Sequence, residues 1–78
     1  MNDNINDLIK REELIALFET YQDFLTQIQK QAFILYFYEN LSYQEIANET
    51  ATSRSAAYDS VNKAIKKLQN IQQKLKKM

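Results

Sequence analysis

The 78-residue sequence contains no glycine, proline, cysteine or histidine. Without glycine and proline it lacks the residues that most often form turns and sheet corners, so we expect a helical protein. The absence of cysteine excludes a disulfide framework and fits a reducing compartment, and we expect a cytoplasmic protein. Because histidine and cysteine are the usual soft-metal ligands, we expect neither a metal nor another cofactor.

Long apolar runs are also missing. The longest, residues 32–38, is too short to cross a bilayer, and residues 1–7 are too polar and acidic for a signal peptide. The length supports one domain, residues 1–78, whose core is marginal unless long helices or a second subunit add burial. The sequence therefore predicts a soluble single domain with no membrane partner.

Charge is divided along the chain. Residues 1–60 hold all ten acids and only four basic residues, a net charge of −6, whereas residues 61–78 hold six lysines and no acid. The C-terminal end therefore attracts phosphates while the rest repels them. The lysines also fit a second interpretation, the composition bias of an AT-rich genome, and both interpretations stay open.

Apolar spacing predicts four helices. In residues 5–25 apolar side chains recur at three- and four-residue steps, as on one face of a helix: Leu8, Ile9, Leu14, Leu17, Phe18, Tyr21, Phe24 and Leu25. Thr26 is a cap for a second helix that reaches Tyr38. That helix is apolar nearly all round, with Ile28, Ala32, Leu35 and Tyr36 in one stripe, so we place it at the centre of the molecule.

The third and fourth helices form a helix-turn-helix over residues 42–67. Ser42 and Glu45 make a capping box that starts the third helix, in which Ile46 and the small Ala47 point inward. The pattern breaks at residues 50–52, and Ser53 caps the last helix. This helix is predicted over residues 54–78, about 37 Å at 1.5 Å per residue, so residues 68–78 form a basic extension of the motif.

The last helix carries a heptad stripe, which is typical of helix packing: Ala57, Val61, Ala64, Leu68, Ile71, Leu75 and Met78. Its second half needs apolar cover from the first helix or from a second subunit. We therefore predict that Leu68, Ile71 and Leu75 form a dimer contact or a contact between helices.

Three segments resemble the bacterial YlxM family: LFETYQDFLT at residues 17–26, YQEIA at 43–47 and SRSAAYD at 53–59. The similarity covers nearly all of the chain from Arg11 onward. It implies an all-α, four-helix orthogonal helix-turn-helix fold of the winged-helix-like DNA-binding type, similar to region 4 of sigma factors. The family is commonly encoded beside signal recognition particle genes. The resemblance therefore implies a regulatory protein, a homodimer, that contacts the particle's protein or RNA.

The sequence departs from the family's pattern at two positions of the motif. Thr52 stands where a buried Val-like residue is usual, and Ala57 stands where a larger aliphatic is common. We expect a loosely packed turn, with the local core weakened by about 1–3 kcal/mol.

Exposed positions of the last helix are the candidate contacts to nucleic acid or a partner: Arg54, Ser55, Tyr58 and Asn62, flanked by Lys63, Lys66 and Lys67. Asp59 places a carboxylate among them and opposes DNA. Structural interpretations stand beside the functional ones: Arg54 pairs with Glu45 or Glu49, and Tyr58 packs against a neighbouring helix.

The sequence lacks the residue types of common catalytic sites, which need a nucleophile with a base, a metal cluster or a glycine-rich phosphate loop. We therefore predict a non-enzymatic regulatory binding protein of the signal recognition particle pathway. The alternative is a transcriptional regulator that binds DNA. A third hypothesis is an interaction module that uses the heptad stripe alone.

Overall fold

A computed structural model describes the backbone of residues 3–77 and the side chains of residues 10–77. Its elements, in chain order, are α1 (Asp3–Tyr21), a 3-10 turn η1 (Gln22–Phe24), α2 (Gln27–Phe33), a π-helical turn η2 (Ile34–Tyr38), α3 (Tyr43–Thr50) and α4 (Arg54–Lys76). Residues 3–77 contain no β-strand. The predicted all-α, four-helix fold with a long C-terminal helix is confirmed.

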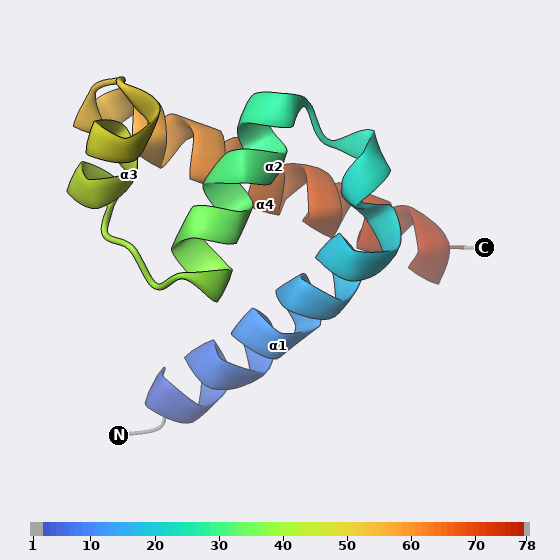
Figure 1. Ribbon diagram of the computed structural model, residues 1–78. Helices are drawn as coiled ribbons and strands as arrows, with labels where there is room; N and C mark the ends of the chain where they lie inside the picture. The colour runs from blue at the N-terminus through green and yellow to red at the C-terminus, as the bar shows by residue number, and fades with distance from the viewer. Residues whose placement is uncertain (1–2, 78) are drawn as a thin grey trace.

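The long helix α4 is the element on which the others pack. It runs behind α2, with α3 beside its first half and the end of α1 beside its second half (Figure 1). Its 23 residues span about 34 Å. The molecule measures 40 × 34 × 18 Å, so it is flat and leaves one side of every helix close to solvent.

Side-chain caps start three helices at the predicted residues. Thr26 and Gln29 form a capping box at α2, with Oγ1 and Oε1 accepting reciprocal backbone bonds of 3.2 and 3.1 Å. Ser42 and Glu45 do the same at α3, and the Ser53 hydroxyl accepts from the Ala56 amide at 3.1 Å. Caps of this kind satisfy orphan amides of the first turn, so they define where each helix begins.

The first helix is shorter than predicted. We expected it to reach Leu25, which is wrong: α1 ends at Tyr21, and η1 closes with a 3.0 Å bond from the Leu25 amide to the Gln22 carbonyl. The extended backbone of Leu25 (φ −90°, ψ 149°) leads into the Thr26 cap and buries its side chain. Phe24, predicted to lie on the buried stripe, is 64% exposed.

The second helix reaches Tyr38 as predicted but changes type at Ile34. In η2 the Glu39 amide bonds to the Ile34 carbonyl at 3.2 Å, five residues back. A wider turn of this kind brings side chains four positions apart onto nearly the same face. Accordingly, Phe33 and Phe37 stack with ring centroids 4.4 Å apart.

Arg11 fastens α1 to the end of this turn. Its Nη2 donates to the Phe37 carbonyl at 2.6 Å and to Asn40 Oδ1, and its guanidinium lies 5.4 Å from the centroid of the Phe37 ring. Asn40 has a positive φ of 58°, which asparagine tolerates better than most residues. The chain therefore turns out of η2 without glycine.

The core has two parts. The aromatic cluster lies between α1, α2 and α4 and comprises Phe18, Leu25, Phe33, Phe37, Ala64 and Leu68. The small-residue cluster lies between α2, α3 and α4 and comprises Ala32, Ile46, Ala47, Ala57 and Val61. Ile28, predicted to lie on the inner stripe of α2, is 68% exposed.

Candidate nucleic-acid interface

The pairing of α3 with α4 depends on small side chains. Ala47 is fully buried and packs in one cluster with Ala57 and Val61, which allows the two helices to approach closely. The turn between them uses Ala51 in the left-handed conformation, with φ of 55°. The Thr52 amide then bonds to the Ala47 carbonyl at 2.9 Å.

A hollow opens beside the start of α4. Its volume is about 260 Å³, and Tyr43, Arg54, Ser55 and Tyr58 line it. The structure thus brings together three of the residues predicted to contact nucleic acid or a partner. Tyr43, which sequence reasoning included only in the segment YQEIA that resembles the YlxM family, is the fourth.

Three tyrosines form a row behind this hollow. The rings of Tyr36 and Tyr43 stack with centroids 5.1 Å apart and planes 8° from parallel, and Tyr58 meets Tyr43 nearly edge-on at 5.1 Å and 73°. Burial, followed by the neighbouring Tyr36, raises the pKa of the Tyr43 phenol to about 12. The Tyr43 hydroxyl therefore stays neutral at physiological pH, while 54% of Tyr58 remains exposed.

Arg54 is exposed at the edge of the hollow. Within the part of the chain whose side chains are described, it forms no ion pair, so the alternative pairing with Glu45 or Glu49 is absent there. The Ser42 amide, which donates to the Glu45 carboxylate, lowers the pKa of Glu45. Glu45, which is exposed on α3, therefore carries a negative charge.

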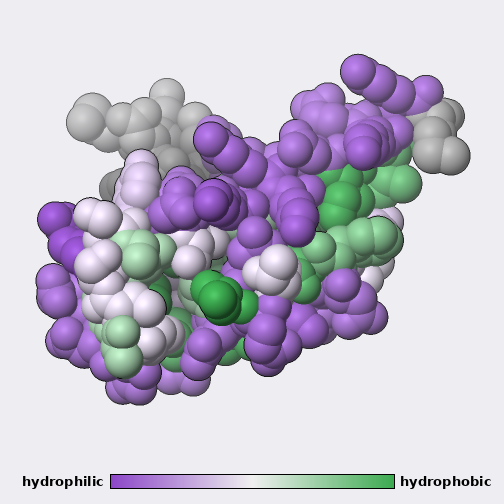
Figure 2. All heavy atoms as spheres, turned by 90° about the horizontal axis from the view of Figure 1, so that it is seen from above, coloured by the Kyte–Doolittle hydropathy of each residue, from purple (hydrophilic) through white to green (hydrophobic). Residues whose placement is uncertain are grey.

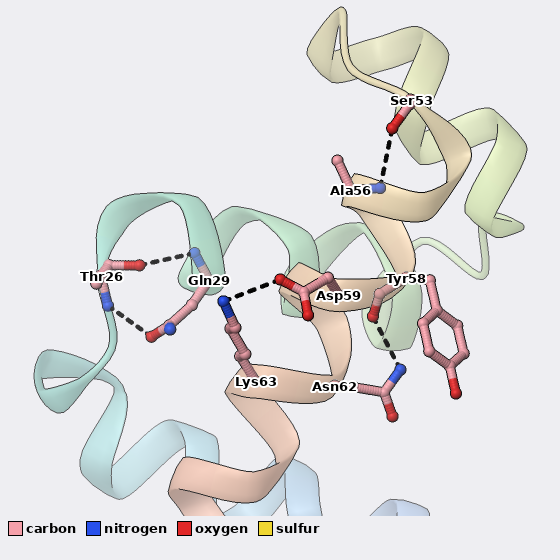
Figure 3. A network of polar contacts seen from close by, with 8 residues as sticks. All are labelled: Thr26, Gln29, Ser53, Ala56, Tyr58, Asp59, Asn62 and Lys63. Carbon is pink, nitrogen blue, oxygen red and sulfur yellow. Dashed lines mark hydrogen bonds and ion pairs between the residues drawn. The ribbon is translucent and has the colours of Figure 1, made fainter.

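Asn62 is less available than the sequence suggests. Its Nδ2 donates to the Tyr58 carbonyl at 2.8 Å, one turn earlier in α4, and its side chain is half-buried (Figure 3). An amide that spends a donor on the backbone has fewer groups left to bind an adenine edge.

Two of the predicted lysines lie on another flank of α4. Lys63 Nζ pairs with Asp59 at 3.0 Å, and Lys67 Nζ donates to Gln29 Oε1 of α2 at 3.4 Å. In Figure 3, Asp59 and Lys63 point to one side of α4, and Tyr58 and Asn62 point to the other. The pair with Lys63 turns the only acid of α4 away from the hollow.

Lys66 falls on the same side of α4 as the hollow, because successive residues turn by about 100° around a helix. We name this side the open face of α4 and define it as Arg54, Ser55, Tyr58, Asn62 and Lys66. Asp59 borders this face, about 40° around the helix from Ser55, and its carboxylate pairs with Lys63. The seven predicted contacts are thus divided between the open face and a lysine flank, Lys63 and Lys67.

The residues predicted for dimer or helix packing differ in exposure. Leu68 is fully buried within the aromatic cluster, Ile71 is half-buried, and Leu75 is 48% exposed. The helix α1 contributes Phe18 to the same cluster as Leu68, and Leu14, Leu17 and Tyr21 of α1 pack against that cluster. Met78, the last residue of the predicted stripe, lies outside the described residues.

A second hollow, about 140 Å³, lies beside Thr52 and Ala57, where we expected loose packing. Its lining includes Thr50, Thr52, Ala57 and the exposed Ile28. Thr52 stays at the surface, with its hydroxyl 2.8 Å from that of Thr50. Small side chains at positions 52 and 57 therefore leave space beside the small-residue cluster.

The face seen from above in Figure 2 is mostly hydrophilic, with apolar surface in its middle and toward the C-terminal end. No helix within residues 3–77 is long and apolar enough to cross a membrane. Among the side chains of residues 10–77, no group of three or more acidic residues is placed to hold a metal ion.

Comparison with known proteins first defines the class, a helix-turn-helix protein. The family model UPF0122, described as "Putative helix-turn-helix protein, YlxM / p13 like", matches residues 8–78. The chain belongs to this family, so the predicted membership is confirmed.

Relatives from three bacterial genera carry the same family name. The chain is 47% identical over 70 residues to a UPF0122 protein of Mycoplasma capricolum, covering 90% of this chain and 62% of that protein. It is 41% identical to one of Limosilactobacillus fermentum, covering 88% and 61%, and 38% identical to one of Streptococcus pyogenes, covering 92% and 64%. It thus spans less than two thirds of each relative. No solved structure matches the chain.

Proposed function

We propose that this chain is a non-enzymatic regulatory protein that binds nucleic acid with the open face of α4. The observation that carries the proposal is the composition of that face: Arg54, Ser55, Tyr58 and Lys66 are exposed, and the one acid at its border, Asp59, is paired with Lys63. Arginine and lysine beside a hydroxyl and an aromatic ring are the groups that bind phosphates and bases.

The proposal extends to the signal recognition particle pathway in the cytoplasm, through contact with the particle's RNA or protein. Support comes from the resemblance of residues 17–26, 43–47 and 53–59 to the YlxM family, commonly encoded beside the genes of that particle. The lysine flank and the lysines after residue 70 add positive charge for an anionic partner.

Titration of fluorescent signal recognition particle RNA tests this proposal, with a transfer RNA and the particle's protein as separate probes. We expect Arg54→Ala to weaken RNA binding and to lower the slope of log K against log salt by about 1. Lys10→Ala is the matched control, because it removes one positive charge from α1, outside the hollow that Arg54 lines. Absence of binding to the particle's RNA and protein at low salt would contradict the pathway assignment.

A second candidate is a transcriptional regulator that reads duplex DNA. The exposure of Arg54, Ser55 and Tyr58 in the first turns of α4 favours it, since these positions of a recognition helix reach base edges. The ionised Glu45 on α3 and the internally bonded Asn62 oppose it. Gel shifts with genomic fragments distinguish the two candidate functions. Sequence-specific shifts that Arg54→Ala abolishes would establish a transcriptional regulator in place of a protein of the signal recognition particle pathway.

We also propose a homodimer through the exposed end of the apolar stripe on α4. Leu75→Asp is the informative variant, because Leu75 is 48% exposed whereas Leu68 is buried inside the protomer. Sedimentation should show a lower mass for Leu75→Asp, since an apolar seam disfavours a charge, and no change for the exposed Gln73→Asp. Equal masses for the wild type and both variants would refute a dimer through Leu75.

A further inference from the structure

The hollow beside α4 has the size of one ring system. Its volume of about 260 Å³ lies just below the range of about 300–1,000 Å³ found for sites of drug-sized ligands. It is therefore large enough to hold a single planar group.

Its walls provide a fixed aromatic platform. Tyr58 is more than half exposed, yet its ring is held against Tyr43, which in turn stacks on Tyr36. A ring positioned in advance loses little conformational freedom when a ligand stacks on it. The row of tyrosines thus prepares Tyr58 to receive a flat partner.

The edge of the hollow provides a cation and a hydroxyl. Arg54 has no ion-pair partner among the side chains of residues 10–77, and Ser55 is exposed next to it. Asp59, which borders the open face, is engaged by Lys63. A flat apolar surface beside an unpaired guanidinium matches a nucleobase that is joined to a phosphate.

Base pairing limits which nucleic acid can enter. Bases inside a duplex are stacked on both sides, and only loops, bulges and single strands present a base that aromatic side chains can stack on. We propose that the hollow between Tyr43 and Tyr58 binds an unpaired nucleobase of a single-stranded segment, stacked on Tyr58, with Arg54 on its phosphate. This inference rests on the proposed nucleic-acid binding and adds the kind of segment that is bound.

The test uses an RNA hairpin with 2-aminopurine, a fluorescent adenine analogue quenched by stacking, in its loop. A duplex with 2-aminopurine opposite uridine is the paired probe. The wild type should bind the hairpin more tightly than the duplex and quench the loop base. Tyr58→Leu should weaken hairpin binding about fivefold or more relative to duplex binding and abolish the quenching. Tyr58→Phe should recover most of both, because it keeps the ring.

Tyr38→Leu is the matched control, since Tyr38 is 44% exposed but hydrogen-bonds to Glu19 of α1, outside the hollow; it should bind like the wild type. Equal binding to hairpin and duplex, with Tyr58→Leu unchanged, overturns the inference and leaves the proposed function standing. The same probes with a deoxyribose loop separate single-stranded DNA from RNA. Absence of binding to every probe at low salt overturns both, and capture of an aromatic peptide in place of RNA also overturns the inference.

Discussion

The two clusters of the core differ in the size of the side chains that fill them. In the aromatic cluster Phe33 is fully buried between Phe18 and Phe37, with both ring centroids 4.4 Å away. In the small-residue cluster Ala47 and Ala57 bring α3 against α4. The large rings of the aromatic cluster bury much apolar area. The small side chains of the small-residue cluster bury less area, but they allow α3 and α4 to approach closely.

The difference places the large buried rings in one half of the molecule and the proposed binding face beside the other. Burial stabilises in proportion to the apolar area removed from water, so the aromatic cluster contributes more per residue. The small-residue cluster positions Tyr43 and Tyr58 but leaves a hollow of about 140 Å³ beside Ala57. Substitutions in the first cluster should therefore lower stability, whereas substitutions in the second should also move the open face.

The largest effect is expected from Phe33→Ala. Loss of a fully buried ring that stacks on two others should lower the free energy of unfolding by about 3–5 kcal/mol, a large part of the stability of a small domain. Phe24→Ala, in the exposed turn η1, should change it by less than about 0.5 kcal/mol. Urea unfolding measures both, and equal losses would contradict the assignment of Phe33 to the core.

Ala47→Leu should lower the free energy of unfolding by less than Phe33→Ala does, and it should also change RNA binding. A larger side chain between α3 and α4 should cost about 1–3 kcal/mol by overpacking. It should also displace Tyr43 from Tyr58 and weaken RNA binding. The exposed Ala16→Leu is the control and should alter neither. Normal RNA binding by a destabilised Ala47→Leu would show that the open face does not depend on this helix contact.

Much of the fold could be predicted from the sequence because its signals are local. The capping residues Thr26, Ser42 and Ser53 and the apolar spacing of α4 each act within one or two turns. The break after Tyr21 has no such signal, since the apolar steps continue through Phe24 and Leu25. Only the packing of Leu25 in the tertiary core explains why the chain leaves the helix there.

The candidate site was less predictable because it depends on side-chain directions across helices. Arg54, Ser55 and Tyr58 follow from the motif, but Tyr43 required knowledge that its ring faces α4. Its position directly after the cap Ser42 was the available signal. The spacing of Asp59 and Lys63, four residues apart in a helix, was an available signal for their pairing, whereas nothing in the sequence shows that Asn62 bonds to its own helix.

The hollow beside Ala57 allows the comparison between the two core clusters to be tested with a larger side chain, which should fill the hollow and stabilise the protein relative to a control. Ala57→Val adds two methyl groups toward that space, whereas Ala56→Val adds them to an exposed position with the same loss of helix propensity. We expect the free energy of unfolding of Ala57→Val to exceed that of Ala56→Val by about 0.5–1.5 kcal/mol. A deficit in thermal or urea unfolding would mean that the hollow does not accept a larger side chain.

The smallest expected effect concerns the turn that ends α3. Ala51 has a φ of 55°, a conformation that costs a residue with a Cβ about 1–2 kcal/mol and costs glycine almost nothing. After the greater freedom of glycine in the unfolded chain is subtracted, Ala51→Gly should raise the free energy of unfolding by about 0.5–1 kcal/mol. Ala16→Gly, inside α1, should lower it by about 1 kcal/mol. Opposite signs for the same substitution would establish the left-handed turn as strained, and two losses would place Ala51 in an ordinary helical conformation.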